Sequence, residues 1–184
     1  MSARVGRWCV GWFRAKNPVL RFVALFGLLL GLLYAVISSA SFGHAVYPPY
    51  VRLSAQTASR VCNWFGQGTS AREGAVLSAR FCLRIQWGCD AIEPTALFVA
   101  AVLAFPASFR RKVPGILLGA MVLAVLNLAR IVSLFLVGVY FPAAFEWMHL
   151  EAWQILFVLL AIVLWAVWIQ WAMRPRPAAS YVPG

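Results

Sequence analysis

Hydrophobic positions dominate four long stretches of the chain, and clusters of basic residues lie beside them. The apolar stretches cover residues 22–42, 93–109, 113–140 and 150–173. About twenty consecutive apolar residues are enough for a helix to cross the roughly 30 Å hydrocarbon core of a bilayer. The pattern therefore predicts an all-α polytopic membrane protein with about four transmembrane helices, organised as one membrane domain over residues 1–184.

Residues 43–92 form the one sizeable segment that the pattern does not place in the bilayer. Within it, apolar residues recur at helical spacing over 49–65, which predicts an amphipathic helix lying on the membrane surface. Apolar and polar residues then alternate from Leu77 to Trp87, as in a β-strand with one buried face. Glu73-Gly74 is a candidate turn from a shorter partner at 68–72. We expect a small β-hairpin or strand before the second span.

Charge supports a membrane protein and gives its orientation. Only 11% of the residues are charged, against about 25% in an average soluble protein. The net charge of +11 comes from short basic clusters at the ends of the apolar stretches, so nucleic-acid binding is not expected. By the positive-inside rule, residues 1–21 and the tail 174–184 are cytoplasmic and the segment 43–92 lies outside. We expect a multi-pass protein of the cell inner membrane, with a functional site at the outer, periplasmic face.

Arg130 is the first candidate functional residue. It stands in an otherwise uncharged stretch from Val113 to Phe145. A charge within a bilayer costs several kcal/mol, so such residues usually face protein or water and carry a function. Asn127, three residues earlier, falls on a neighbouring part of the same helical face.

Two further candidates fall near the level of Arg130. With a rise of 1.5 Å per residue from the nearest cytoplasmic basic residue, the heights are roughly 31 Å for Cys89, 27 Å for Arg130 and 37 Å for His149. Asp90 and Glu93 have the spacing of a helix N-terminal cap, which places Cys89 at the positive end of a helix dipole. A thiol in that position is expected to have a lowered pKa.

A cysteine, a histidine and an arginine at one level can carry out acyl transfer. The thiolate attacks a carbonyl, the imidazole takes and returns a proton, and the cation stabilises the oxyanion. Each residue also has a structural explanation: Cys89 as a small buried hydrophobic residue, and His149 as an interfacial anchor near Trp147 and Trp153.

Other candidate roles are weaker. The carboxylates Asp90, Glu93, Glu146 and Glu151 are read as caps or surface acids, any of which could also orient His149. Too few ligands converge for a metal site, and no cofactor is predicted. Cys62 and Cys82 lie in the external segment, where oxidation permits a disulfide between them, whereas Cys9 is expected to be cytoplasmic.

A set of motifs between Gly88 and about Met173 carries a resemblance to a known family. The set comprises Cys89 before one span, Ala104-Phe-Pro before a basic turn, Asn127-x-x-Arg130-Ile-Val-Ser-Leu-Phe-Leu-Val-Gly, and His149 at the start of the last span. In these features the chain resembles the exosortase/archaeosortase family of membrane cysteine transpeptidases, and most closely the small exosortase H type. Residues 22–87 match only in layout.

The resemblance implies a mechanism and a class of substrate. Cys89 would be the nucleophile, His149 the general acid and base, and Arg130 the group that stabilises the thiolate or oxyanion, with Asn127 as a supporting partner. The substrate would be an exported protein whose C-terminal sorting signal has a short motif, a hydrophobic helix and a basic tail. Cleavage through a thioester would pass the protein to an acceptor that the sequence does not identify.

One local feature departs from the family pattern. Family members usually have Asn-Gly or Ser-Gly after the nucleophile, and this chain has Asp90-Ala91. The change bears on the turn that orients Cys89.

The sequence leaves a second class of function open. A non-enzymatic membrane subunit could dock a partner helix through Arg130, and it would then tolerate replacement of Cys89 and His149. A transporter or channel is less favoured, because the chain has one intramembrane charge and no repeat.

Overall fold

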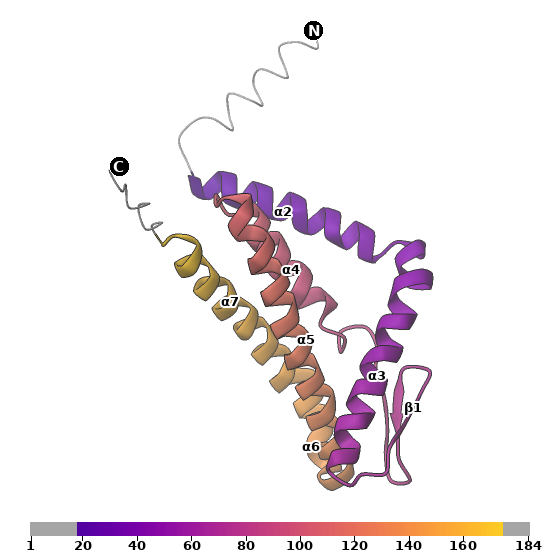
Figure 1. Ribbon diagram of the computed structural model, residues 1–184. Helices are drawn as coiled ribbons and strands as arrows, with labels where there is room; N and C mark the ends of the chain where they lie inside the picture. The colour runs from indigo at the N-terminus through magenta and orange to yellow at the C-terminus, as the bar shows by residue number, and fades with distance from the viewer. Residues whose placement is uncertain (1–17, 175–184) are drawn as a thin grey trace, which may run out of the picture.

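The computed structural model describes residues 18–174, and helices account for most of them (Figure 1). The elements in chain order are α2 (Pro18–Ile37), η1 (Phe42–Val46), α3 (Tyr47–Trp64), β1 (Ser70–Arg72), β2 (Ala75–Leu77), β3 (Cys82–Arg84), α4 (Ile92–Ala104), α5 (Phe109–Tyr140), α6 (Pro142–Trp147), η2 (Met148–Ala152) and α7 (Trp153–Ala172). The two η segments are single turns of π-helix. A mainly helical membrane protein with a small sheet before α4 agrees with the predicted fold class.

Three helical segments are long and apolar enough to cross a membrane. They are α2 with 20 residues, α5 with 32 residues, and the continuous stretch Pro142–Ala172 with 31 residues. α4 is apolar but has only 13 residues, fewer than the roughly twenty that a full span needs. It packs against α2 on one side and against α5 and α7 on another. The predicted second span of 93–109 is therefore a short helix set among the long ones.

Local sequence explains where the first helices end. α2 stops at Ile37 rather than at residue 42, because the Ser39 hydroxyl donates to the carbonyl of Val36 at 2.6 Å and turns the chain. α4 stops at Ala104, since Phe105 precedes a proline and adopts an extended conformation (φ −69°, ψ 138°).

α5 differs from the predicted third span at its beginning. It starts at Phe109 rather than at residue 113, so Pro114 lies inside the helix. The helix then runs without interruption through Gly138 to Tyr140 and ends where Phe141 precedes Pro142. Gly138 is a point of close contact, because a Cβ atom there would lie 2.3 Å from the ring of Phe81.

The segment 43–92 folds onto the C-terminal half of α5. The apolar face of α3, which includes Val51, Ala55 and Ala58, is buried against the sheet and α5. The amphipathic helix is thus confirmed, but its apolar face covers protein instead of lying on lipid.

The predicted strand over 77–87 is not continuous, because β2 ends at Leu77 and β3 covers only Cys82–Arg84. β1 pairs with β2 in an antiparallel hairpin through the Glu73-Gly74 turn, and β2 pairs with β3. A tight turn separates β2 from β3, in which the backbone N–H of Ser78 donates to Phe81 O at 2.9 Å. The Ser78 hydroxyl accepts from the N–H groups of Arg80 and Phe81, which closes this turn.

The cysteines of the external segment are not joined. Cys62 and Cys82 are both free: Cys62 is fully buried in α3, and Cys82 is exposed on β3. Neighbouring residues of a strand point to opposite faces, so the burial of Leu83 turns Cys82 away from the core. The disulfide that the sequence permitted is absent from the structure.

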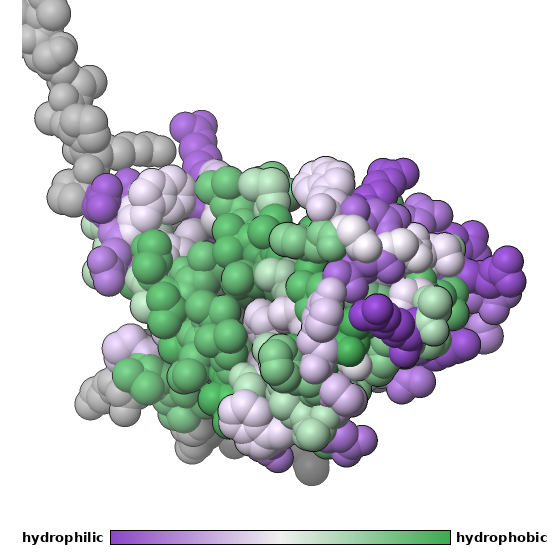
Figure 2. All heavy atoms as spheres, turned by 90° about the horizontal axis from the view of Figure 1, so that it is seen from below, coloured by the Kyte–Doolittle hydropathy of each residue, from purple (hydrophilic) through white to green (hydrophobic). Residues whose placement is uncertain are grey.

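Two apolar cores hold the molecule together. The first joins α3, the sheet and the C-terminal half of α5, and the second joins α4, α5 and α7. Figure 2 shows hydrophobic residues over one side and hydrophilic residues gathered on the side where α3 and the sheet lie. Large apolar side chains such as Leu28, Leu117 and Val163 are more than half exposed, as expected for surfaces that face lipid.

Candidate active site

Arg130 lies at the centre of the candidate site. Its side chain is 2% exposed, on the face of α5 that looks toward the loop before α4 and the start of the last helical stretch. Nη1 donates to the carbonyl of Gly88 at 3.0 Å, and Nη2 reaches the carbonyl of His149 at 3.5 Å. The guanidinium carbon is 5.7 Å from the centre of the Phe157 ring. Arg130 therefore ties together the two segments that carry the other candidates.

Cys89 sits in a strained loop immediately before α4. Gly88 has a positive φ of 85°, which glycine adopts at little cost, and the N–H of Cys89 donates to Gln86 O at 3.0 Å. Ala91 also has a positive φ, 59°, a conformation that costs a residue with a side chain about 1 kcal/mol or more. This is the position at which the resembling family has glycine. The backbone keeps the glycine-type turn although the residue is alanine.

His149 is part of the π-helical turn η2. The preceding helix α6 is short, and the π turn leads directly into α7. The imidazole is half-buried beside Phe145, with 5.6 Å between the ring centres. π-helical turns are rare and occur often at functional sites.

The structure brings the three segments together but does not complete the catalytic contacts. Arg130 touches the backbone of His149 and of the residue before Cys89. Within residues 18–174, no hydrogen bond joins the Cys89 thiol to the His149 imidazole. Catalytic hydrogen bonds often form only when the substrate is bound.

The environment of Cys89 differs from that predicted by the helix dipole. Its side chain is 3% exposed, and burial raises the pKa of the thiol above the usual value for cysteine. The positive charge of Arg130 acts in the opposite direction, and the carboxylate of Asp90 adds to the rise in pKa. The prediction of a lowered pKa was wrong because burial outweighs the favourable charges.

Asp90 is a buried member of the site rather than a simple cap. Its side chain is fully buried, and Oδ1 accepts from the N–H of Ile92 at 3.0 Å, while Oδ2 has no partner among the described residues. The residue at the N-cap position of α4 is Ala91. Burial raises the pKa of the Asp90 carboxyl, and the Ile92 N–H and Tyr47 oppose that rise.

Two tyrosines of α3 complete the surroundings, and the sequence analysis did not identify them. The Tyr50 hydroxyl donates to the backbone carbonyl of Asp90. The Tyr47 hydroxyl is buried near Asp90, and burial together with that carboxylate raises the pKa of Tyr47. Both come from the sequence Tyr-Pro-Pro-Tyr at the start of α3, where a spacing of three residues puts them on one face.

Asn127 lies one helical turn before Arg130 and reaches toward α3. It is 2% exposed, and its Oδ1 has no hydrogen-bond partner within the described residues. Asn127 and Tyr50 both line a cavity of about 280 Å³ between α3 and α5. Tyr50 therefore links the two residues, because it lines this cavity with Asn127 and its hydroxyl donates to the backbone carbonyl of Asp90.

Comparison with known proteins agrees with the resemblance seen in the sequence. A family model described as transmembrane exosortase (Exosortase_EpsH) matches residues 5–166. Searches of curated proteins and of solved structures found no match.

Proposed function

Because the chain belongs to the transmembrane exosortase family, we propose that it is a membrane cysteine peptidase or transpeptidase whose catalytic residues are Cys89, Arg130 and His149. The observation that carries this proposal is the pair of contacts from buried Arg130 to the carbonyls of Gly88 and His149. They hold the nucleophile loop and the histidine turn at fixed positions on either side of one cation. A buried cation held between the cysteine loop and the histidine turn is suited to stabilise a thiolate or an oxyanion.

The proposed reaction begins with proton transfer from the Cys89 thiol to the His149 imidazole. The thiolate sulfur attacks the carbonyl carbon of the scissile peptide, and negative charge moves to the carbonyl oxygen. The amide C–N bond then breaks, the imidazolium returns its proton to the leaving amine, and a thioester on Cys89 remains. An acceptor nucleophile or water releases the acyl group and regenerates the thiol.

Arg130 would stabilise charge at two stages of this reaction. Its positive charge favours the Cys89 thiolate, which opposes the effect of burial. The Nε–H group of Arg130 is also buried and has no hydrogen-bond partner among the described residues. A pre-positioned donor of this kind is worth about 10²–10³ in rate where it meets a developing oxyanion.

The substrate class follows from family membership. We propose exported proteins with a C-terminal sorting signal of motif, hydrophobic helix and basic tail, cleaved at the outer face of the inner membrane.

The alternative, a subunit that docks a partner helix through Arg130, has less support. The guanidinium is 2% exposed and already bonded to two carbonyls of its own chain. An acidic residue on a partner helix would have to displace these contacts.

The test is co-expression of the protein with a candidate substrate bearing a sorting signal. The mass of the substrate is compared between the unchanged protein, Cys89→Ala and His149→Ala. Loss of the C-terminal tail only with the unchanged protein supports the proposal, and the mass of the new C-terminus distinguishes transfer from hydrolysis. Equal processing by Cys89→Ala would rule out Cys89 as the nucleophile.

A further inference from the structure

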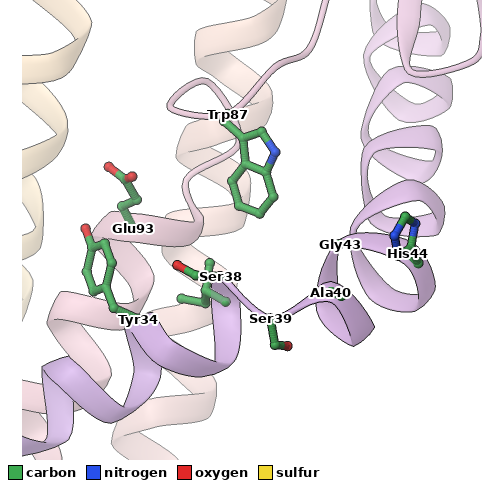
Figure 3. A pocket seen from close by; sticks show the side chains of 9 residues that line it. Tyr34, Ser38, Ser39, Ala40, Gly43, His44, Trp87 and Glu93 are labelled. Carbon is green, nitrogen blue, oxygen red and sulfur yellow. The ribbon is translucent and has the colours of Figure 1, made fainter.

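A second polar pocket lies beside the Cys89 loop, separate from the contacts described above. It has a volume of about 350 Å³ and is formed by the end of α2, η1 and the beginning of α4. Its polar lining consists of Tyr34, Ser38, Ser39, His44 and Glu93, and Trp87 forms an aromatic wall (Figure 3). The proposed peptidase chemistry uses none of these side chains.

The charge of this pocket is opposite to that of the protein. The chain has 16 basic and 5 acidic residues, yet the pocket contains the carboxylate of Glu93 and no lysine or arginine. In Figure 3, the Glu93 carboxylate and the Tyr34 hydroxyl lie on the same side of the pocket. Within residues 18–174, the Glu93 carboxylate takes part in no hydrogen bond or ion pair. The pocket therefore favours a cation over an anion or a neutral apolar group.

Trp87 is held in a defined orientation next to this carboxylate. Its indole stacks on the ring of Tyr47 with 4.0 Å between the ring centres and 2° between the planes. Phe42 packs nearby at 6.3 Å. The face of a tryptophan ring attracts a cation within about 6 Å, and does so more strongly than the rings of tyrosine and phenylalanine. A fixed indole and a free carboxylate on one pocket are the two elements of an ammonium site.

We propose that this pocket binds a primary ammonium group on a short aliphatic stem. The ammonium has three N–H donors, and the pocket offers acceptors at Glu93 and at the hydroxyls of Tyr34 and Ser38. The volume leaves space for several carbon atoms beside the ring of Trp87. An inorganic cation would use the carboxylate but not the apolar remainder of the pocket.

The site adjoins the nucleophile through the chain itself. Trp87 precedes Cys89 by two residues and Glu93 follows it by four. Tyr47 connects them in space, because its ring stacks on Trp87 and its hydroxyl lies near Asp90. An amine bound here is thus held on the same loop as Cys89, although its binding does not depend on the reactivity of Cys89.

Calorimetric titration of the purified full chain in neutral maltoside micelles tests the proposal. Hexylamine is the probe, and hexanol is the neutral control of the same length. We expect saturable binding of hexylamine, at least about tenfold weaker binding of hexanol, and at least about tenfold weaker hexylamine binding to Glu93→Gln, because a charge-assisted contact is lost. Glu73→Gln, in the β1–β2 turn, removes an acid outside the pocket and should leave the affinity unchanged.

A second variant keeps the test decisive if Glu93→Gln is unstable. Trp87→Leu retains the carboxylate and removes the aromatic face, and it should weaken hexylamine binding about threefold to tenfold. Equal affinities for hexylamine and hexanol would overturn the proposal. So would unchanged hexylamine binding in both the Trp87 variant and a folded Glu93 variant.

The source of the amine is resolved by adding lipid. If the natural ligand is a lipid headgroup, phosphatidylethanolamine in the micelles should compete with hexylamine, whereas phosphatidylglycerol should not. If the ligand is a soluble amine or a lysine side chain, hexylamine binding should be the same with both lipids. Each result is consistent with an ammonium site and assigns its source.

Discussion

The two apolar cores of the protein are built in different ways. In the core of α4, α5 and α7 the helices approach closely at glycines that face aromatic rings, and the buried polar atoms without a partner among the described residues are the indole nitrogens of Trp153 and Trp165. Asp90, Asn127 and Arg130 are all buried and lie beside the core of α3, the sheet and the C-terminal half of α5. Four of the six buried polar atoms without a partner in the described residues belong to Tyr47, Asp90, Asn127 and Arg130.

This difference separates stability from function. Unpartnered buried polar groups are costly, so a protein retains them where they have a use. The core of α4, α5 and α7 holds the helices at fixed separations. The core of α3, the sheet and α5 places charges and donors beside Cys89. Substitutions in the two cores should therefore produce different defects, and the following predictions test that distinction.

The largest expected effect is that of Cys89→Ala on substrate processing. Removal of a nucleophile should lower the rate by at least about a thousandfold, while the free energy of unfolding changes little because alanine fills most of the same space. Cys62→Ala is the matched control, since Cys62 is also fully buried in the same core. Processing is measured from the mass of the substrate, and equal losses in both variants would point to a packing effect.

Arg130→Lys should lower the rate by about 10²–10³. Lysine keeps the charge, but its single nitrogen cannot occupy the positions of both Nη1 and Nη2, which contact the carbonyls of Gly88 and His149. The measurement is the processing rate per folded molecule, with folding followed by circular dichroism. A rate near that of the unchanged protein would show that charge alone is enough and that the two contacts are dispensable.

In the core of α4, α5 and α7, Gly119→Ala should reduce stability without a loss of activity per folded molecule. A Cβ at Gly119 would lie 2.1 Å from the ring of Phe98, so α4 and α5 must move apart at a cost of about 1–3 kcal/mol. Gly27→Ala on α2 meets no atom within 4 Å and serves as the control. Unfolding in detergent gives the free energy; a fall in the activity of folded Gly119→Ala would contradict the separation of the two cores.

The reactivity of Cys89 should depend on pH in a way that its neighbours control. Because its pKa is raised, the reactive thiolate should appear only as pH increases beyond the usual cysteine range. Asp90→Asn removes a charge that raises the pKa, so alkylation should reach its midpoint at lower pH. Arg130→Met removes a charge that lowers the pKa, so the midpoint should move upward.

Alkylation of a protein whose other cysteines are replaced by serine provides the measurement for this pH dependence. Identical midpoints in the three proteins would mean that neither charge acts on the thiol.

The smallest predicted effect is a gain in stability from Ala91→Gly. Glycine adopts the positive φ of this position without strain, so the free energy of unfolding should rise by about 0.5–1 kcal/mol. Ala96→Gly, within α4, should lower it by about 1 kcal/mol because glycine is unfavourable inside a helix. Thermal unfolding distinguishes the two, and a loss of stability in Ala91→Gly would contradict the strained turn.

The sequence predicted the features that depend on local pattern. Apolar stretches placed the long helices, alternation located the sheet, and the isolated charge singled out Arg130. The sequence also predicted that Cys89, Arg130 and His149 lie at a similar height along their helices, and the contacts made by Arg130 agree with that prediction. That prediction used only the helical rise counted from the nearest cytoplasmic basic residue.

Features that depend on packing could not be predicted in the same way. The alternating residues 77–87 gave no sign that the Ser78 hydroxyl would close a turn. Burial of Cys89 depends on contacts with distant parts of the chain, so the sign of its pKa shift was missed. The participation of Tyr47 and Tyr50 required the position of α3 against the loop before α4, which no local signal specifies.

The measurement that tests the central claim most directly is detection of a covalent intermediate on Cys89. The protein is incubated with a sorting-signal substrate, quenched in acid and digested, and the peptide containing Cys89 is examined by mass spectrometry. We predict an adduct with the mass of the acyl portion of the substrate, released by neutral hydroxylamine and absent from Cys89→Ala. Processing of the substrate with an adduct on another residue, or at an unchanged rate in Cys89→Ala, would contradict the account.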